Sequence, residues 1–168
     1  MFQSLVAECA PEIALCFTAT DSGLRSIEFM RDEADLPLPE HGEAPGAQAR
    51  RILDDAVRQM RAYFAGALRQ FTVRLDPQGT DFQKRVWRQL ETIPFGQVRS
   101  YAQVAEAIGA PRAVRAVGAA NGANPLPIVV PCHRVIGSGG KLVGYGGGLP
   151  LKKLLLELEG CNMVLFRT

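Results

Sequence analysis

The chain has 168 residues, enough for one ordinary domain or for two small ones that share an interface. Apolar residues make up 47% and charged residues 21%, the balance of a globular protein, and the longest apolar stretch is too short to span a bilayer. The net charge of +2 divides unevenly: residues 1–76 carry eight basic and twelve acidic side chains, and residues 77–168 carry eleven and five. We therefore expect no membrane association, and a polyanionic partner for the back half only.

The front half, residues 1–76, reads as a small α/β domain. Two strands are expected at 15–19 and 24–29, because Asp21-Ser22-Gly23 supplies turn chemistry between them. Residues 32–48 hold three prolines and several acidic side chains, which is typical of a surface loop. Apolar residues then recur at helical spacing from Ala49 until Gly66, and alternation over 71–75 predicts one more strand.

The back half, residues 80–168, opens with two capping-box patterns. Thr80 and Ser100 each stand three residues before a glutamine. The first pattern predicts a helix that stops at Pro94, and the second predicts a short helix that Gly109 ends.

A third helix is expected from Arg112 to about Gly122, with Pro111 in its first turn. A short helix, a tight turn and a second helix make a helix-turn-helix, although many helical hairpins share this layout without touching DNA.

The composition of this third helix allows two interpretations. Its charges are Arg112 and Arg115, and the remaining residues are mostly small: Ala113, Ala116, Gly118, Ala119, Ala120 and Gly122. Small side chains suit tight packing against neighbouring helices. They also suit close approach to a nucleic-acid groove, into which an arginine could reach. Few of these residues could read base edges, so such a helix would recognise the shape of a distorted duplex.

Cys132 and His133 are the strongest candidates for chemistry. A thiolate is the reactive form of cysteine, and a neighbouring imidazole or positive charge favours it. The pair follows the apolar residues 126–130, which we expect to form a buried strand. An inert buried thiol is the competing interpretation, and the favoured one for Cys9, Cys16 and Cys161.

No metal or cofactor is expected. The four cysteines and two histidines lack zinc-site spacing, although Cys9, Cys16 and His41 leave a loose site open. The glycine-rich run 144–148 lacks the Gly-Lys-Ser/Thr ending of a phosphate loop. Cysteines without framework spacing, and a start without a secretory signal, favour the reducing cytoplasm.

The segment Pro131-Cys132-His133-Arg134-Val135 is similar to the active-site signature of the O6-alkylguanine-DNA alkyltransferases, the methylated-DNA–protein-cysteine methyltransferases. The resemblance runs from about Thr80 to Gly160. It also includes, in the same order, Phe95-Gly96, Ser100-Tyr101, Arg115-Ala116-Val117-Gly118, Asn124-Pro125, Tyr145-x-Gly147-Gly148 and Glu159-Gly160. The front half resembles the family's smaller N-terminal domain more loosely, and its first dozen residues depart from the usual opening strand pair.

The resemblance implies DNA repair by irreversible, single-turnover transfer of an alkyl group from O6-alkylguanine in duplex DNA to Cys132. His133, bridged to the sulfur by a water and oriented by Glu159, would take the thiol proton. Tyr101 would donate a proton toward guanine N3, and Asn124 would tie the recognition helix to the active-site strand.

The resemblance also implies how the DNA is held. Arg115 would fill the gap left when the damaged base flips out of the stack. Ala113, Ala116, Gly118, Ala119 and Arg134 would contact DNA, and Val135, Tyr145 and Gly146 would line the pocket. We expect a monomer; cooperative binding on DNA, O4-alkylthymine repair and the range of alkyl groups stay open.

Three alternatives remain: a protein that recognises alkyl lesions without transfer, a DNA-binding regulator with an inert cysteine, and a cysteine hydrolase. The expected fold is α/β, with a small antiparallel sheet and a helix in front. A mostly helical domain follows, which carries a winged-helix-like helix-turn-helix and the active-site cysteine.

Overall fold

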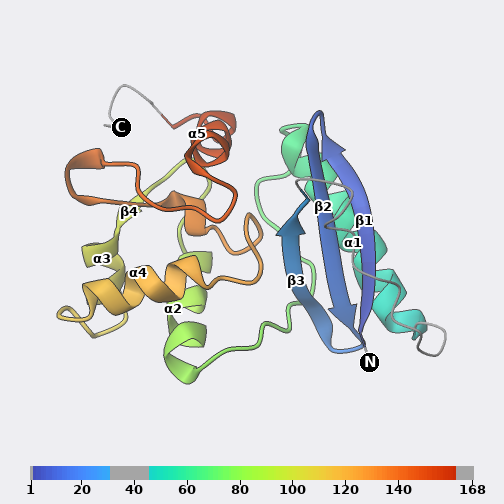
Figure 1. Cartoon of the computed structure of the whole chain (residues 1–168), viewed down its shortest axis with the longest axis horizontal. Helices are drawn as coiled ribbons and strands as arrows, with labels where there is room; N and C mark the ends of the chain where they lie inside the picture. Colours follow the sequence, from blue (N-terminus) through green and yellow to red (C-terminus); the bar gives the residue numbers. More distant parts are fainter. Residues whose placement is uncertain (1, 31–45, 162–168) are drawn as a thin grey trace. The chain divides into compact units, whose positions relative to one another are not determined.

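The computed structural model describes residues 2–30 and 46–161 of the chain. The chain divides into two compact units, Met1–Gln78 and Gly79–Thr168 (Figure 1). Most of the expected loop at 32–48 lies outside the described residues. The first unit is a sheet with one helix and the second is mainly helical, which is the α/β organisation that the sequence predicts.

The first unit contains a three-stranded antiparallel sheet in the order β1-β2-β3. The strands are β1 (Gln3–Ala10), β2 (Ile13–Thr20) and β3 (Gly23–Phe29), and the expected hairpin is formed by β2 and β3. The first dozen residues depart from the opening strand pair that is usual in the family, yet β1 pairs with β2 along most of its length, with Leu5 opposite Phe17.

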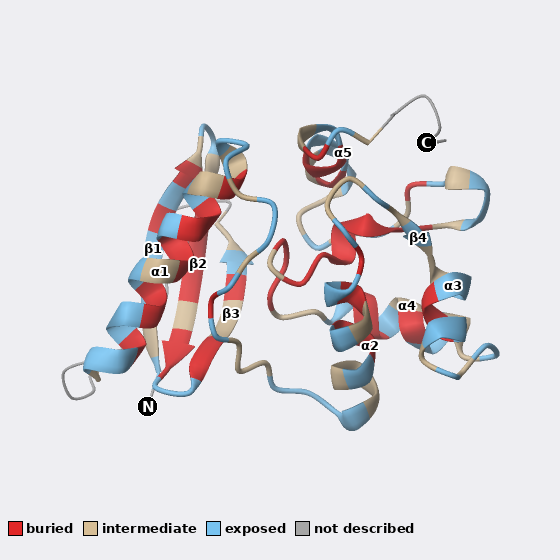
Figure 2. Ribbon diagram, turned by 180° about the vertical axis from the view of Figure 1, so that it is seen from behind, coloured by how far each residue is buried: buried red, intermediate tan, exposed pale blue. Residues whose placement is uncertain are grey.

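Helix α1 (Ala47–Phe64) covers one face of this sheet (Figure 1). Leu53, Met60 and Tyr63 are fully buried on α1, and Leu15 and Phe17 are fully buried on β2. The buried residues lie along β2 and along one side of α1 (Figure 2). The helical spacing from Ala49 therefore predicts α1 correctly, although the helix begins two residues earlier.

The strand predicted at 71–75 is wrong. Only Leu75 forms a bridge, to Leu24. The buried side chain of Gln59 from α1 takes one backbone group of this segment: Thr72 N donates to Gln59 Oε1 at 2.8 Å, and Gln59 Nε2 donates to the side chain of Thr72 at 3.1 Å. An alternating pattern cannot reveal that a distant side chain binds a backbone N–H here.

The second unit begins with α2 (Asp81–Glu91), β4 (Arg99–Ser100) and α3 (Tyr101–Ala107). Both predicted capping boxes are present. Gln83 N donates to Thr80 Oγ1 and Gln103 N donates to Ser100 Oγ, each at 3.2 Å. Gly109 follows α3 with a φ of 71°, a backbone conformation that glycine adopts without strain.

Helix α4 (Val114–Gly122) follows α3, which gives the expected helix-turn-helix order. It begins two residues later than predicted, because Pro111 and Arg112 lie in the preceding turn and Ala113 occupies the N-cap position. Trp87 of α2 donates its indole N–H to Ala120 O at 2.8 Å, which fixes α4 against α2.

The rest of the second unit runs through η2 (Cys132–Arg134), β5 (Val135–Ile136) and η3 (Ser138–Gly140) to α5 (Leu149–Leu158). Strands β4 and β5 form a short parallel pair. The buried strand expected at 126–130 is wrong. This segment is a tight turn in which Val130 N donates to Leu126 O at 2.8 Å and Ile128 has a φ of 74°.

Candidate active site

Cys132 is the first residue of the short helix η2, and two asparagines of the α4 region hold the segment that carries it. Asn124 Nδ2 donates to Val130 O at 2.8 Å, and Leu126 N donates to Asn124 Oδ1 at 3.0 Å. Asn121, buried on α4, donates to Cys132 O at 3.5 Å. The end of α4 is therefore tied to a turn, where the sequence predicted a strand.

The Cys132 thiol is 5% exposed. Burial raises its pKa above the ordinary value, while a hydrogen bond from the Asn124 side chain and the positive charge of Lys152 act in the opposite direction. Burial is the largest effect, so the resting sulfur is a thiol. A reaction at this sulfur therefore needs a base to remove the proton.

His133 and Glu159 form a buried hydrogen-bonded pair. His133 Nε2 lies 2.8 Å from Glu159 Oε1, and neither side chain is exposed. The carboxylate also accepts from Gly96 N at 3.1 Å and from two nitrogens of the Arg134 guanidinium. Glu159, at the end of α5, is thus held by Gly96 from the loop after α2 and by two residues of η2.

These contacts set the protonation of the pair. Burial raises the pKa of Glu159, but the hydrogen bonds from His133 and Arg134 and the positive charge of Arg134 outweigh it and hold the pKa at about 2, so Glu159 is a carboxylate. Burial, with the charges of Arg134 and Lys152, lowers the pKa of His133 despite the opposing effect of Glu159. A neutral imidazole beside a carboxylate carries its proton on Nε2, which leaves Nδ1 able to accept one. Nδ1 has no hydrogen-bond partner among the described residues.

Tyr101, the first residue of α3, lies within electrostatic range of this site. Burial raises the pKa of the Tyr101 hydroxyl, and the charge that Cys132 would carry as a thiolate raises it further. A Cβ atom added at Gly118 of α4 would lie 3.9 Å from the Tyr101 ring, so Gly118 packs beside the ring at an ordinary contact distance. Tyr101 is therefore a protonated hydroxyl, able to donate a hydrogen bond near Cys132.

The outer face of α4 is exposed and nearly free of large side chains. Arg115, Ala116 and Ala119 are exposed on it, while Val117 and Ala120 face the core. Ala113 and Gly118 are half-buried. The small residues of α4 therefore serve on two faces. One face packs against the core of the second unit, and the other is an exposed surface of small side chains that carries Arg115.

The three residues expected to line a pocket are placed differently from one another. Val135 is fully buried in β5, Gly146 is exposed, and Tyr145 is half-buried. The Tyr145 ring lies edge-on to the His133 ring, with centroids 6.4 Å apart. Of the three, Tyr145 is the one that the structure brings next to the Cys132–His133 pair.

The DNA contact expected of Arg134 does not fit its position. Its side chain is 7% exposed, and its guanidinium donates to both oxygens of Glu159 and to Ile93 O. A charge engaged in this way cannot also neutralise a phosphate. The sequence motif places Arg134 beside His133 but cannot show that Glu159, 25 residues away, folds back onto it.

Lys152 is a site residue that the sequence reasoning missed. Its ammonium is fully buried and donates to Val135 O at 2.6 Å, Val143 O at 2.8 Å and Gly144 O at 3.4 Å. Burial lowers its pKa to about 8. Its position on the buried face of α5, three residues before Leu155 and four before Leu156, was the available signal.

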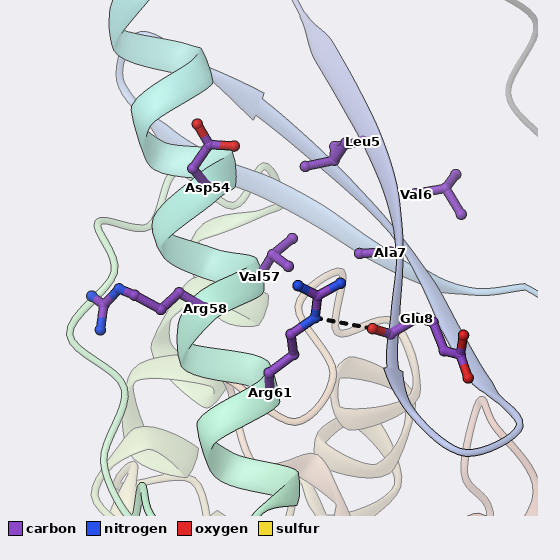
Figure 3. A pocket seen from close by; sticks show the side chains of 8 residues that line it. All are labelled: Leu5, Val6, Ala7, Glu8, Asp54, Val57, Arg58 and Arg61. Carbon is purple, nitrogen blue, oxygen red and sulfur yellow. Dashed lines mark hydrogen bonds between the residues drawn. The ribbon is translucent and has the colours of Figure 1, made fainter.

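A groove of about 520 Å³ lies in the first unit between β1 and α1, lined among others by Asp54, Arg58 and Arg61 (Figure 3). Arg61 Nε donates to Glu8 O across it. None of the residues that line it is a cysteine or a histidine.

The sequence predicts neither a metal site nor a segment that spans a membrane. Within residues 2–30 and 46–161, no three His, Cys, Asp or Glu side chains are arranged to hold a metal ion, and His41 lies outside these ranges. None of the described helices combines the length and apolar character that crossing a bilayer requires.

The fold and the site together define a class: a helix-turn-helix unit built around a buried cysteine with its own histidine and carboxylate. The sequence models of 6-O-methylguanine DNA methyltransferase match both units, the DNA binding domain over residues 81–161 and the ribonuclease-like domain over 14–77. The chain belongs to the methylated-DNA–protein-cysteine methyltransferase family, as the resemblance at Cys132 predicts.

Relatives and solved structures agree with this assignment. The methylated-DNA–protein-cysteine methyltransferase of Methanosarcina barkeri is 44% identical over 149 residues, which covers 89% of this chain and 92% of the relative. The crystal structure of Mycobacterium tuberculosis OGT in complex with DNA is similar with a TM-score of 0.77 and 47% identity, over 94% of this chain and 91% of that one. The O6-methylguanine-DNA methyltransferase of Pyrococcus kodakaraensis is similar with a TM-score of 0.56 and 26% identity, over 95% and 99%.

Proposed function

We propose that the protein repairs DNA by transferring the alkyl group of O6-alkylguanine to the sulfur of Cys132. The observation that carries this proposal is the buried pair His133–Glu159 beside a protonated thiol. Glu159 occupies Nε2 of the imidazole, so Nδ1 is free to take the thiol proton. A structural cysteine would need no such base.

The transfer is a single displacement at carbon. The bond between Cys132 Sγ and the alkyl carbon forms as the bond between that carbon and guanine O6 breaks. His133 takes the thiol proton by way of one bridging water, and Tyr101 donates a proton to N3 of the departing purine. The proton held by His133 then restores the Tyr101 hydroxyl, so the net result is a thioether on Cys132 and a guanine that carries one more proton in place of the alkyl group. No cofactor is needed, because no electron is gained or lost.

The thioether is stable, so each molecule acts once. A thiolate is a far better nucleophile than a leaving group from saturated carbon, and no described group could displace it again. We infer that the reaction is stoichiometric, and that a cysteine hydrolase, which turns over, is the wrong class.

The substrate is double-stranded DNA, and we propose that α4 binds it in the minor groove. The exposed face of α4 is small enough for close approach, and Arg115 is the exposed cation on it. The O6 alkyl group of a stacked base cannot reach a sulfur that is 5% exposed, so the damaged nucleotide flips out and Arg115 fills the gap. Tyr145 then forms part of the wall beside the flipped base.

The two units divide the work in this proposal. Residues 80–168 bind DNA and accept the alkyl group, while residues 1–76 support them. The protein acts as a monomer in the cytoplasm, where reducing conditions keep Cys132 a free thiol.

The test is mass spectrometry after mixing the protein with excess duplex that contains one O6-methylguanine. We expect a gain of one methyl mass per molecule, located on the Cys132 peptide, and none with the Cys132→Ser variant or with undamaged duplex. Tight lesion binding without a mass gain would instead make the protein a recognition protein. Binding without preference for the lesion would favour a DNA-binding regulator.

A further inference from the structure

Arg134 is a buried charged side chain of the site that donates three hydrogen bonds, and the motif alone gives it no chemical task. Its Nε donates to Glu159 Oε2 at 2.8 Å and its Nη2 to Glu159 Oε1 at 2.9 Å, a two-point contact with one carboxylate. Its Nη1 donates to Ile93 O at 2.5 Å, and its guanidinium carbon lies 5.9 Å from the centre of the Phe95 ring. The charge is therefore fixed on Glu159.

We propose that Arg134 is a positioning residue that holds Glu159 as a carboxylate, so that His133 stays in the neutral form able to take the Cys132 proton. The inference rests on the proposed function, because it concerns the base in that reaction. It gives the fourth residue of the Pro131-Cys132-His133-Arg134 segment a task in the protein interior, where the sequence reasoning had assigned it to DNA.

The charges around the imidazole decide whether His133 is protonated. A buried carboxylate whose single neighbour is an imidazole is best neutralised by protonating that imidazole. Arg134 already supplies the positive charge that Glu159 needs, so a proton on His133 would leave the buried group with an excess charge. An imidazolium could not accept the thiol proton, and the first step of the transfer would stop.

The other groups that face His133 act in both directions, and burial together with the charges of Arg134 and Lys152 outweighs the effect of Glu159. Glu159, at the end of α5, favours the protonated imidazole, whereas Arg134 on η2 and Lys152 on α5 both oppose it. Cys132 is a thiol at rest and adds no negative charge, and the Tyr145 ring meets the imidazole edge-on. Gly96 N contacts the carboxylate as a neutral donor. Removing Arg134 would leave Lys152 as the remaining positive charge that opposes protonation of His133.

The test compares how the rate of methyl transfer depends on pH in wild type, Arg134→Gln and Arg134→Lys, with saturating duplex and single-turnover conditions. In Arg134→Gln the pKa of His133 rises, so the acid side of the rate profile moves to higher pH. The rate at acid pH falls about tenfold for each unit of that rise, while the rate at alkaline pH changes little. Arg134→Lys keeps the charge but not the two-point contact, so its profile stays at the wild-type position with a lower maximum.

Arg88→Gln is the matched control, because Arg88 is exposed on α2 and bonds within its own helix. Equal loss at every pH in Arg134→Gln would overturn the inference and leave Arg134 with a purely structural role. An acid shift in Arg134→Lys as large as that in Arg134→Gln would overturn it too, because the charge would then not be the cause. A wild type that transfers no methyl group at any pH would instead refute the proposed function.

A second measurement needs no variant and covers the case in which Arg134→Gln does not fold. Nitrogen-15 NMR of the wild type, whose histidines are His41 and His133, reports the protonation of each ring nitrogen. We expect the folded protein to protonate His133 at a lower pH than the unfolded chain does, and its neutral form to carry the proton on Nε2. Protonation of His133 at a higher pH in the folded protein than in the unfolded chain would overturn the inference.

Discussion

Replacing Glu159 by glutamine preserves the shape of the side chain and removes the charge that organises the site. The carboxylate accepts hydrogen bonds from His133, Arg134 and Gly96. Burial raises its pKa, but the contacts with His133 and Arg134 outweigh burial and hold the pKa at about 2 rather than the ordinary 4.5. A difference of this size corresponds to about 3 kcal/mol of folding free energy at 1.36 kcal/mol per unit.

The direction of the pH effect follows from the lowered pKa. The unfolded chain binds a proton at Glu159 more readily than the folded chain does, so the stabilisation is present above about pH 4.5. It is lost as the pH falls towards 2. The Glu159→Gln variant lacks this loss, and it is less stable at neutral pH by roughly 3–5 kcal/mol because the buried guanidinium of Arg134 has no anion.

The assay is urea unfolding at several pH values, followed by the fluorescence of Trp87. This residue is the chain's single tryptophan and is 2% exposed in the second unit, so its signal reports that unit. Glu157→Gln is the matched control, since Glu157 lies on the same helix, half-exposed, 3.8 Å from Lys153. We expect wild type and Glu157→Gln to lose about 3 kcal/mol more than Glu159→Gln between pH 4.5 and 2. Equal acid sensitivity in all three proteins would refute the reasoning.

Three further predictions concern neighbouring positions. Gly96→Ala should lower the unfolding free energy by more than Gly109→Ala. Both glycines have φ above 70°, but only a Cβ at position 96 would lie 2.9 Å from Glu159 O. Equal unfolding free energies of the two variants in urea would contradict this. Arg115→Ala should slow methyl transfer from duplex DNA by about tenfold or more while transfer from the free base O6-methylguanine is unchanged, whereas equal slowing of both reactions would argue against a role in base flipping. Between pH 8 and 10.5 the wild type and the exposed control Lys153→Met should gain about 3 kcal/mol of stability, because the folded chain gives up the buried charge of Lys152 at a lower pH than the unfolded chain does. Lys152→Met should lack this gain, and a gain that persists in that variant would assign it to another group.

Local signals in the sequence predict most of the helices. The capping boxes at Thr80 and Ser100 need only side chains three residues apart, and the apolar spacing of α1 needs only its own residues. These patterns depend on residues of a single helix, so they predict that helix whatever the tertiary structure around it.

The errors arise where distant contacts decide the structure. Gln59 binds the backbone N–H of Thr72 within 71–75, and the apolar residues 126–130 form a turn in which Asn124 bonds to both ends. The family motif predicts a pairing of His133 with Glu159, which the structure shows at 2.8 Å. The motif does not predict that Arg134 is the second partner of this carboxylate, because the two residues are 25 positions apart in the sequence. It does not predict the buried ammonium of Lys152 either, because the partners of Lys152 are backbone carbonyls, which leave no trace in a sequence motif.

The raised pKa of Cys132 looks unfavourable for a nucleophile, yet it suits an acceptor that reacts once. An exposed, permanently ionised thiolate would react with any small electrophile and consume the molecule before it met DNA. Here burial keeps the sulfur protonated, and burial together with the charges of Arg134 and Lys152 keeps His133 neutral. The proton therefore leaves the sulfur only when the alkyl carbon of a flipped base lies against it and the new bond offsets the cost of ionisation. We infer that selectivity for the lesion comes partly from this resting charge state, in addition to the shape of the pocket.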